Sequence, residues 1–248
     1  MTLIMLLLSL SLERFLHKSH LLRRFNWFEH YVSKLHQLTQ HQSWAQPPYS
    51  TLLLVILPLV IPIAIIYGLS LLFLHGLLAL LIGTLVLFYC LGPLNIYEPD
   101  KTHEPIFWKA NETLFAVIFW CALLGPVAAL IYRVVERSVH LHTSYPVLAK
   151  AATPVQAVLD YLPVRLFSIL FSLAGNFVRT SQFFLDHLFT ELSFNRQLLE
   201  KSGRIALGLA DTAELTSENY PPALKLIDRT LILFLIIVFA LTIGCCYR

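Results

Sequence analysis

The sequence predicts an all-α, polytopic helical integral membrane protein with four to five full spans and a short N-terminal membrane-inserted helix. Hydrophobic residues make up 57% of the 248 residues and charged residues only 13%, against about 45–50% and about 25% in a soluble domain. The chain also contains several uncharged runs close to about 20 residues, the length of helix that crosses a bilayer. So little charge cannot cover a water-facing surface, which argues against a soluble enzyme. The net charge of +3 is too small for a nucleic-acid-binding protein.

The N-terminal run, residues 1–12, is apolar and is followed by Glu13 and Arg14. In a cleavable signal peptide, positive charge precedes the apolar run and small residues follow it. Because the charge comes after the run here, we expect residues 1–12 to be retained as a short membrane helix. Residues 13–50 interleave apolar and basic side chains, which predicts a basic segment at the cytoplasmic interface.

The central part of the chain contains the longest apolar stretch. Residues 51–94 contain no charged side chain and are long enough for two helices joined by a tight turn, so they predict a helical hairpin. Residues 95–112 follow as a cytoplasmic loop, and residues 113–133 predict the next span. Gly125 and Pro126 lie inside this span and predict a kink in its helix.

Residues 155–177 are long enough to cross the membrane but contain Asp160, Pro163 and Arg165. If they cross, thirteen Lys and Arg residues lie on the side of the N-terminal basic segment and four on the other. If they do not cross, the two sides hold almost equal numbers. The positive-inside rule therefore favours a crossing, with Pro163 as a second kink.

This crossing places the amphipathic residues 178–229 in the cytoplasm, before a C-terminal span at residues 230–247. The whole chain, residues 1–248, is thus expected to form a single membrane domain.

Polar side chains at membrane depth cost a few kcal/mol to insert, so they usually face the bundle interior and have partners there. The residues of this kind and the polar residues at the span ends form one candidate cluster: Glu13, Asn111, Glu112, Arg133, Asp160 and Arg165. Asp160 and Arg165 lie about 140° apart around a helix, so each is expected to pair with another group. Two interpretations remain open. The cluster forms interhelical ion pairs or snorkels to the interface, or it forms a polar pocket for an anionic headgroup, phosphate or peptide.

The sequence contains no stand-alone catalytic motif and no phosphate-binding glycine loop. His17 and Glu13 share a helix face at four-residue spacing, but no third metal ligand follows at a matching spacing. We therefore expect no metal site, no cofactor and no catalytic residue.

Two long segments resemble the AmpE family of bacterial inner-membrane proteins. Residues Asn111–Arg133 resemble the core span of that family, and Leu159–Leu166 with Gly175-Asn176-Phe177 resemble its next block. Leu12-Glu13-Arg14-Phe15 and the closing apolar helix also fit, so the resemblance covers most of the chain. It implies a multi-pass protein of the bacterial inner membrane that regulates β-lactamase induction, alongside a cytoplasmic amidase that recycles cell-wall muropeptides. The partners implied are the lipid bilayer, a cell-wall-derived or anionic ligand and other membrane or muropeptide-recycling proteins, with no nucleic acid.

AmpE proteins are similar to the CobD/CbiB membrane synthases of the cobalamin pathway, which supply an alternative function. Those synthases share the Gly-Pro and Tyr-Arg elements, present here as Gly125-Pro126 and Tyr132-Arg133, and continue with Asn-Thr-x-Asp. Here Val134-Val135-Glu136-Arg137 follows, and the N-terminal His-Pro element of the synthases is missing. The missing elements disfavour synthase activity. A small transporter is a third alternative, disfavoured because no internal repeat is visible.

Overall fold

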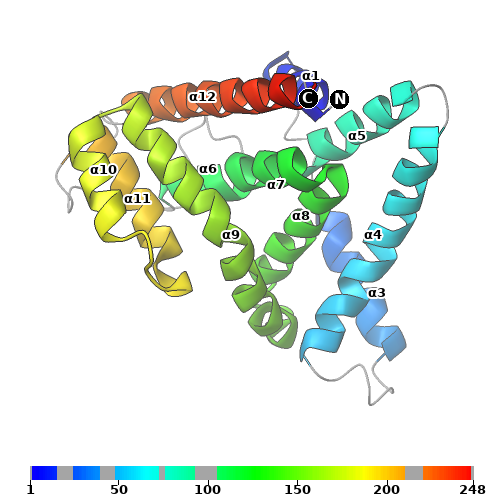
Figure 1. Ribbon diagram of the computed structural model, residues 1–248. Coiled ribbons are helices and arrows are strands. Elements are labelled where there is room, and N and C mark those ends of the chain that lie inside the picture. Colours follow the sequence, from blue (N-terminus) through cyan, green and yellow to red (C-terminus); the bar gives the residue numbers. More distant parts are fainter. Residues whose placement is uncertain are drawn as a thin grey trace. The chain divides into compact units, whose positions relative to one another are not determined.

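The computed structural model describes residues 2–15, 25–39, 48–72, 76–92, 105–209 and 220–246 (Figure 1). These residues form helices and connecting turns, and they contain no strand. Four helices are long and apolar enough to cross a membrane: Tyr49–Leu72, Ile106–Leu124, Pro146–Ala174 and Tyr220–Gly244. The predicted all-α polytopic membrane architecture is confirmed.

The chain divides into two compact units, each built from two separate stretches of sequence. Unit 1 consists of Met1–Pro93 and Val117–Gln156, and unit 2 of Leu94–Ala116 and Ala157–Arg248. The sequence pattern predicts one membrane domain and carries no signal for this division. The reason is that two of the three boundaries lie inside continuous helices, where no linker composition marks them.

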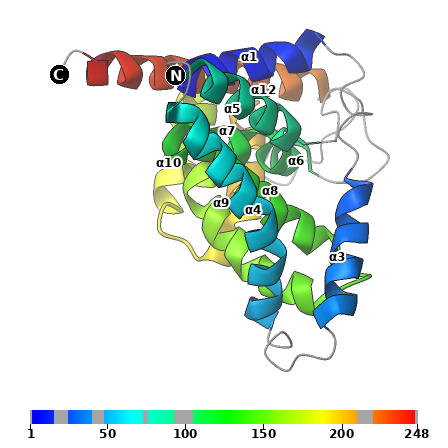
Figure 2. The ribbon, with the colours of Figure 1, turned by 90° about the vertical axis from the view of Figure 1, so that its right-hand side faces the viewer.

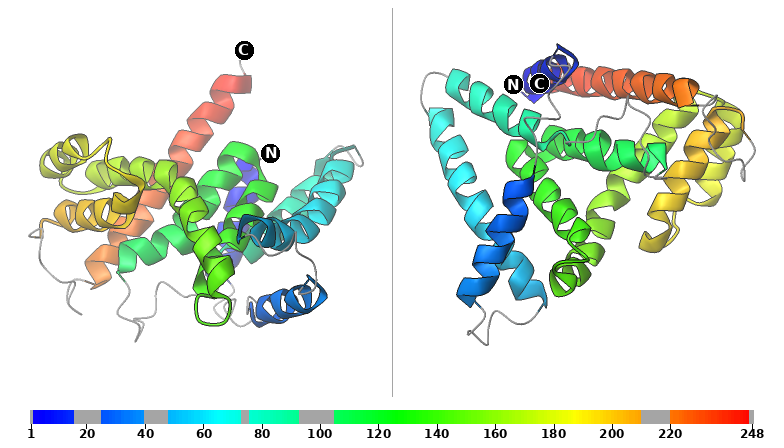
Figure 3. Two further views of the ribbon diagram at one scale, coloured as in Figure 1. Left: turned by 90° about the horizontal axis from the view of Figure 1, so that it is seen from below. Right: turned by 180° about the vertical axis from the view of Figure 1, so that it is seen from behind.

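Unit 1 is a set of antiparallel and crossing helices around the first candidate span. Its helices are α1 (Thr2–Phe15), α3 (Asn26–Thr39), α4 (Pro48–Leu72), α5 (Leu77–Cys90), α7 (Ala116–Leu124) and α8 (Pro126–His140). Helix α1 packs along α5 (Figure 2), where the Ser9 hydroxyl donates a hydrogen bond to the Thr84 carbonyl at 3.2 Å. Helix α3 packs on α4 (Figure 3), where the Tyr31 hydroxyl donates to the Val55 carbonyl at 3.2 Å.

The predicted hairpin over residues 51–94 contains one helix of full span length and one shorter helix. Helix α4 has 25 residues, whereas α5 has 14, which gives α5 a length of about 21 Å. The hydrocarbon core of a bilayer is about 30 Å thick. Helix α5 is therefore a short apolar helix packed between α1, α4 and α8.

Gly125 divides the predicted span over residues 113–133 into two separate helices. Its φ of +91° and ψ of −178° are accessible to glycine and strained for other residues. Pro126 then begins α8, a position where its missing N–H and fixed φ are favourable. The apolar helix consequently begins at Ile106 and ends at Leu124, and the residues after Gly125 belong to a new helix.

Unit 2 contains the first part of the second candidate span, most of the third and all of the fourth, together with a helical hairpin. Its elements are α6 (Ile106–Ala110), the π-helix η3 (Asn111–Phe115), α9 (Pro146–Ala174, from Ala157 onward), α10 (Phe177–Asp186), the 3₁₀ turn η4 (Leu192–Phe194), α11 (Asn195–Ala206) and α12 (Tyr220–Cys246). Helices α10 and α11 lie side by side, as Figures 1 and 3 show. Helices α11 and α12 both contact α6. Pro163 lies inside α9, and the helix continues through it.

The core of unit 2 is a group of aromatic rings. Phe115 stacks on Phe167 with ring centroids 4.1 Å apart, and Phe107 meets Phe171 edge to face at 5.2 Å. All four side chains are fully buried. Gly203 of α11 lies directly against this core, because a Cβ atom at this position would be 2.5 Å from the Phe107 ring.

We expect Gly203→Ala to lower the free energy of unfolding by about 1–3 kcal/mol, since an added methyl must displace the buried Phe107 ring. Gly68→Ala on α4 is the matched control, because no atom lies within 4 Å of a Cβ atom there. Both variants gain the same helix propensity, so the difference between them reports packing. The measurement is thermal unfolding of the purified variants in detergent, and equal stability of the two variants would contradict the close packing.

Candidate functional site

Five of the six predicted polar residues are buried: Asn111, Glu112, Arg133, Asp160 and Arg165. Glu13 is half-buried on α1. Glu13 and Arg133 belong to unit 1, and the other four belong to unit 2. His17, considered with Glu13 as a metal-ligand pair, lies outside the described residues.

Asn111 and Asp160 meet in the interior of unit 2. The side-chain amide of Asn111 donates a hydrogen bond to Oδ1 of Asp160 at 2.8 Å, and neither residue is exposed. Asn111 begins the π-helix η3, which widens the helix by one residue per turn. Four residues further on, Phe115 stacks on Phe167 of α9. The hydrogen bond and the ring stack together fix η3 against α9.

Arg165 is held by oxygen atoms of the chain itself. Its guanidinium donates hydrogen bonds to the carbonyls of Leu188 (2.8 Å), Thr190 (2.9 Å) and Tyr161 (3.1 Å), and to Oδ1 of Asn195 (3.0 Å). The guanidinium carbon also lies 3.3 Å from the centre of the Tyr161 ring, a cation–π contact. No carboxylate of the described residues contacts Arg165. This arginine therefore attaches the turn between α10 and α11 to α9.

Asn195 and Glu200 are site residues that the sequence analysis missed. The Asn195 amide accepts from Arg165 and donates to the Ala157 carbonyl at 2.8 Å, so it links two turns of α9 to the start of α11. Glu200 is 4% exposed, and its Oε1 accepts the backbone N–H of Trp108 at 2.6 Å. Both lie on an amphipathic helix where polar residues are expected to face water. Their burial depends on the packing of α11, so no sequence signal distinguishes them.

Burial raises the pKa of Glu200 to about 7, although the N–H of Trp108 and the guanidinium of Arg204 at 3.9 Å favour its ionised form. The loss of hydration destabilises the ionised carboxylate more than these two contacts stabilise it. Glu200 is therefore partly protonated at neutral pH, while it still accepts a hydrogen bond from the first turn of α6.

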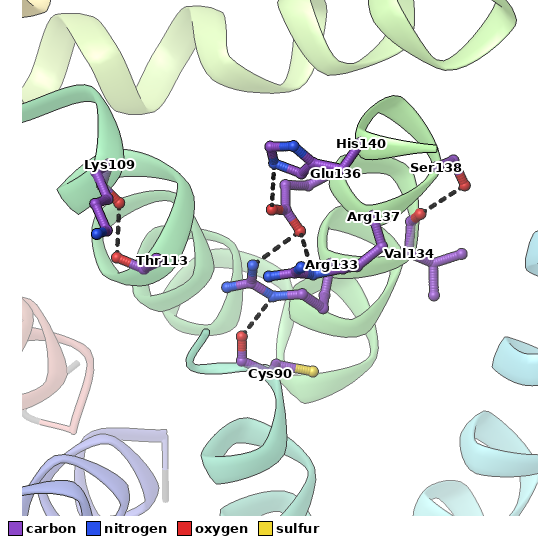
Figure 4. A network of polar contacts seen from close by, with 9 residues as sticks. All are labelled: Cys90, Lys109, Thr113, Arg133, Val134, Glu136, Arg137, Ser138 and His140. Carbon is purple, nitrogen blue, oxygen red and sulfur yellow. Dashed lines mark hydrogen bonds and ion pairs between the residues drawn. The ribbon is translucent and has the colours of Figure 1, made fainter. Parts of the chain in front are cut away.

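A second polar group lies on one face of α8 in unit 1, and we call it the α8 cluster: Arg133, Glu136, Arg137 and His140. Figure 4 shows the three basic side chains around the Glu136 carboxylate. Arg133 donates to Oε2 at 2.9 Å, Arg137 Nε lies 3.2 Å from Oε2, and His140 Nε2 lies 3.0 Å from Oε1. Arg133 also donates from Nε to the carbonyl of Cys90 at 2.7 Å, which joins α8 to the end of α5.

Electrostatic attraction determines the charge state of Glu136, which lies outside the four candidate spans. Burial alone would raise its pKa, but the guanidiniums of Arg133 and Arg137 and the imidazole of His140 outweigh burial and lower the pKa to about 2. Glu136 is thus ionised at neutral pH and orients the basic side chains. The side chains of Arg137 and His140 are 17% and 40% exposed. Arg137 also lies over the Phe25 ring, 4.9 Å from its centre.

The spacing of residues in the sequence is itself a signal for the α8 cluster. Arg133, Glu136, Arg137 and His140 follow one another at intervals of three, one and three residues. On a helix, residues three or four apart share a face, so a single carboxylate between basic residues at this spacing indicates an ion-pair network.

Comparison of the chain with models of protein families, with curated proteins and with solved structures gives no match.

We expect Glu200→Gln to alter the dependence of stability on pH. Since the pKa of Glu200 rises from 4.5 to about 7 on folding, the folded protein binds this proton more tightly, and wild-type stability falls as pH increases between these values. The glutamine retains an acceptor for Trp108 and does not titrate, so the variant should lack this fall and be more stable than wild type at about pH 8. The measurement is the melting temperature in detergent across this pH range. Glu191→Gln, an exposed position on the same hairpin, is the control, and parallel profiles for Glu200→Gln and wild type would contradict the assignment.

Proposed function

We propose that the chain is a regulatory protein of the bacterial inner membrane, of the AmpE type, which modulates β-lactamase induction in connection with the recycling of cell-wall muropeptides. The observation that carries the proposal is the packing of the two segments that resemble this family. Asn111 and Phe115 come from the first segment and contact Asp160 and Phe167, at and directly after the second. Two segments separated by some 25 residues of chain thus form one buried contact in unit 2.

The environment of Arg133 supports a regulatory role over the synthase alternative. In the CobD/CbiB synthases, an Asn-Thr-x-Asp element follows the Tyr-Arg pair, as the resemblance indicates. Here the residues after Arg133 include Glu136, whose carboxylate is ion-paired with Arg133 at 2.9 Å. Arg133 therefore pairs with Glu136, a carboxylate of its own helix. Glu136 lies within residues 134–137, the four positions that the Asn-Thr-x-Asp element would occupy.

The α8 cluster is the ligand-binding face in this proposal, and the ligand is an anionic, cell-wall-derived molecule. Arg137 and His140 are oriented by Glu136, and the His140 side chain is 40% exposed. Nε and Nη2 of Arg137 are buried, so the His140 imidazole supplies the exposed N–H for a carboxylate or phosphate oxygen and Arg137 adds positive charge beside it. Arg165, by contrast, donates four hydrogen bonds within the chain, which supports a structural role for it.

The test is deletion of the coding sequence in a native host that carries an inducible β-lactamase. We expect deletion to change the ratio of induced to uninduced β-lactamase activity after exposure to a cell-wall antibiotic, and wild-type protein to restore it. Arg137→Gln should fail to restore it at equal membrane levels, whereas Lys150→Gln, an exposed control on α9, should restore it.

Unchanged induction in the deletion strain would overturn the proposal. Growth of a cobalamin-synthase-deficient strain on expression of this chain would also overturn it, in favour of the synthase alternative.

A further inference from the structure

Phe189 is the most exposed large hydrophobic side chain in the described part of the chain. It lies in the turn between α10 and α11, and 90% of its surface is exposed. A phenylalanine side chain in water lacks the favourable free energy that burial of its ring would provide. Single exposed apolar residues are common on protein surfaces. The exposure of Phe189 is informative only if hydrogen bonds and packing order the turn around it.

Hydrogen bonds hold the backbone on both sides of Phe189. The buried guanidinium of Arg165 binds the carbonyl of Leu188 and the carbonyl of Thr190, the two residues that flank it. The Thr190 hydroxyl also donates to the carbonyl of His187 at 2.9 Å. With both neighbouring carbonyls turned toward α9, the Phe189 side chain is presented on the outside of the turn.

Aromatic stacking further orders this turn. The His187 ring lies between the rings of Phe183 and Phe194, with centroid distances of 4.4 and 5.3 Å, and is close to parallel with Phe194. Its Nδ1 is 2.9 Å from the carbonyl of Phe183. The exposure of Phe189 is therefore a feature of an ordered turn.

Helix α10 presents three distinct sectors around its axis. At about 100° per residue, its buried side consists of Thr180 and Phe184. The adjoining sector of about 100° contains three exposed apolar side chains, Phe177, Val178 and Leu185. Half-buried Ser181 lies between them, and its hydroxyl donates to the Val178 carbonyl at 3.1 Å. The next exposed sector is polar: Arg179, Gln182 and Asp186. A helix with one side on protein, one apolar exposed side and one polar exposed side is typical of the boundary between lipid and water.

Arg165 places the turn alongside a candidate span. Arg165 lies nine residues before the end of α9 at Ala174, which is about 14 Å along the helix axis. The turn thus extends back along α9 from the end of that helix. Irregular backbone beside a span is tolerated where its polar groups are satisfied within the protein, and Arg165 satisfies the two carbonyls beside Phe189.

We propose that residues 177–206 form a re-entrant helical hairpin whose apolar sector, Phe177, Val178 and Leu185, inserts with Phe189 into the lipid of the same bilayer that α9 crosses. In this placement the polar sector of α10, which lies on a different side of that helix, faces water. This placement differs from the cytoplasmic position that the charge pattern predicts for residues 178–229. The positive-inside rule considers only the positions of Lys and Arg. The turn is held by hydrogen bonds from Arg165 to backbone carbonyls, and this rule does not take such bonds into account.

The test uses a polarity-sensitive dye on single cysteines at three positions of the full-length protein: Phe189→Cys, Leu185→Cys and Gln182→Cys. Cys245 and Cys246 are replaced by serine, and Cys90 and Cys121 are buried. The labelled proteins are reconstituted into vesicles of phosphatidylcholine and phosphatidylglycerol. We expect dyes at Phe189 and Leu185 to be blue-shifted, quenched by lipids with spin labels on their acyl chains and protected from iodide. The dye at Gln182, the control on the polar sector of the same helix, should be quenched by iodide instead.

Two results would overturn the proposal. Equal iodide quenching at all three positions would place the apolar sector in water. Protection of the Phe189 and Leu185 dyes from both quenchers would show that protein, through a partner or a second copy, covers this surface.

Discussion

Charged side chains that lie away from water must be satisfied by the chain itself, and this constraint organises both units. Arg165 binds three backbone carbonyls and one amide oxygen, which attaches the α10–α11 turn to α9. Arg133 binds the Cys90 carbonyl and the Glu136 carboxylate, which joins α8 to α5. An unsatisfied charge at such depth would cost several kcal/mol. The elements that supply the oxygen atoms are therefore fixed in position.

Hydrophobic runs predicted the helical class and the spans, because the length of an apolar helix follows directly from bilayer thickness. The partners of Arg165 were not predictable, since they are carbonyls of Leu188 and Thr190, which any side chains at those positions would provide. The burial of Glu200 could not be predicted either, because it depends on the packing of α11 against α6. Gly125-Pro126 did signal an interruption, but the φ of +91° that separates two helices is a property of the folded chain.

The six candidate polar residues divide by what they contact. Asn111, Asp160 and Arg165 connect elements of unit 2, and their contacts are with the chain's own polar groups. Arg133 belongs to the α8 cluster, in which an ionised Glu136 orients two partly exposed basic side chains. Recognition of an anion by that cluster and insertion of the α10–α11 hairpin into lipid are therefore properties of different units. Either can be tested without disturbing the other.

The most direct measurement of the central constraint is hydrogen–deuterium exchange of residues 183–195 in Arg165→Lys and Arg179→Lys proteins. Lysine keeps the charge of Arg165 but lacks the planar guanidinium, which binds the Leu188 carbonyl through Nε and the Thr190 carbonyl through Nη2. The account predicts faster exchange in Arg165→Lys at the turn amides that are hydrogen-bonded in wild type, those of His187, Leu188, Thr190 and Phe194. Arg179 is exposed on α10, so Arg179→Lys should exchange like wild type. The same exchange rates in all three proteins would contradict the account, because the turn would then be ordered without Arg165.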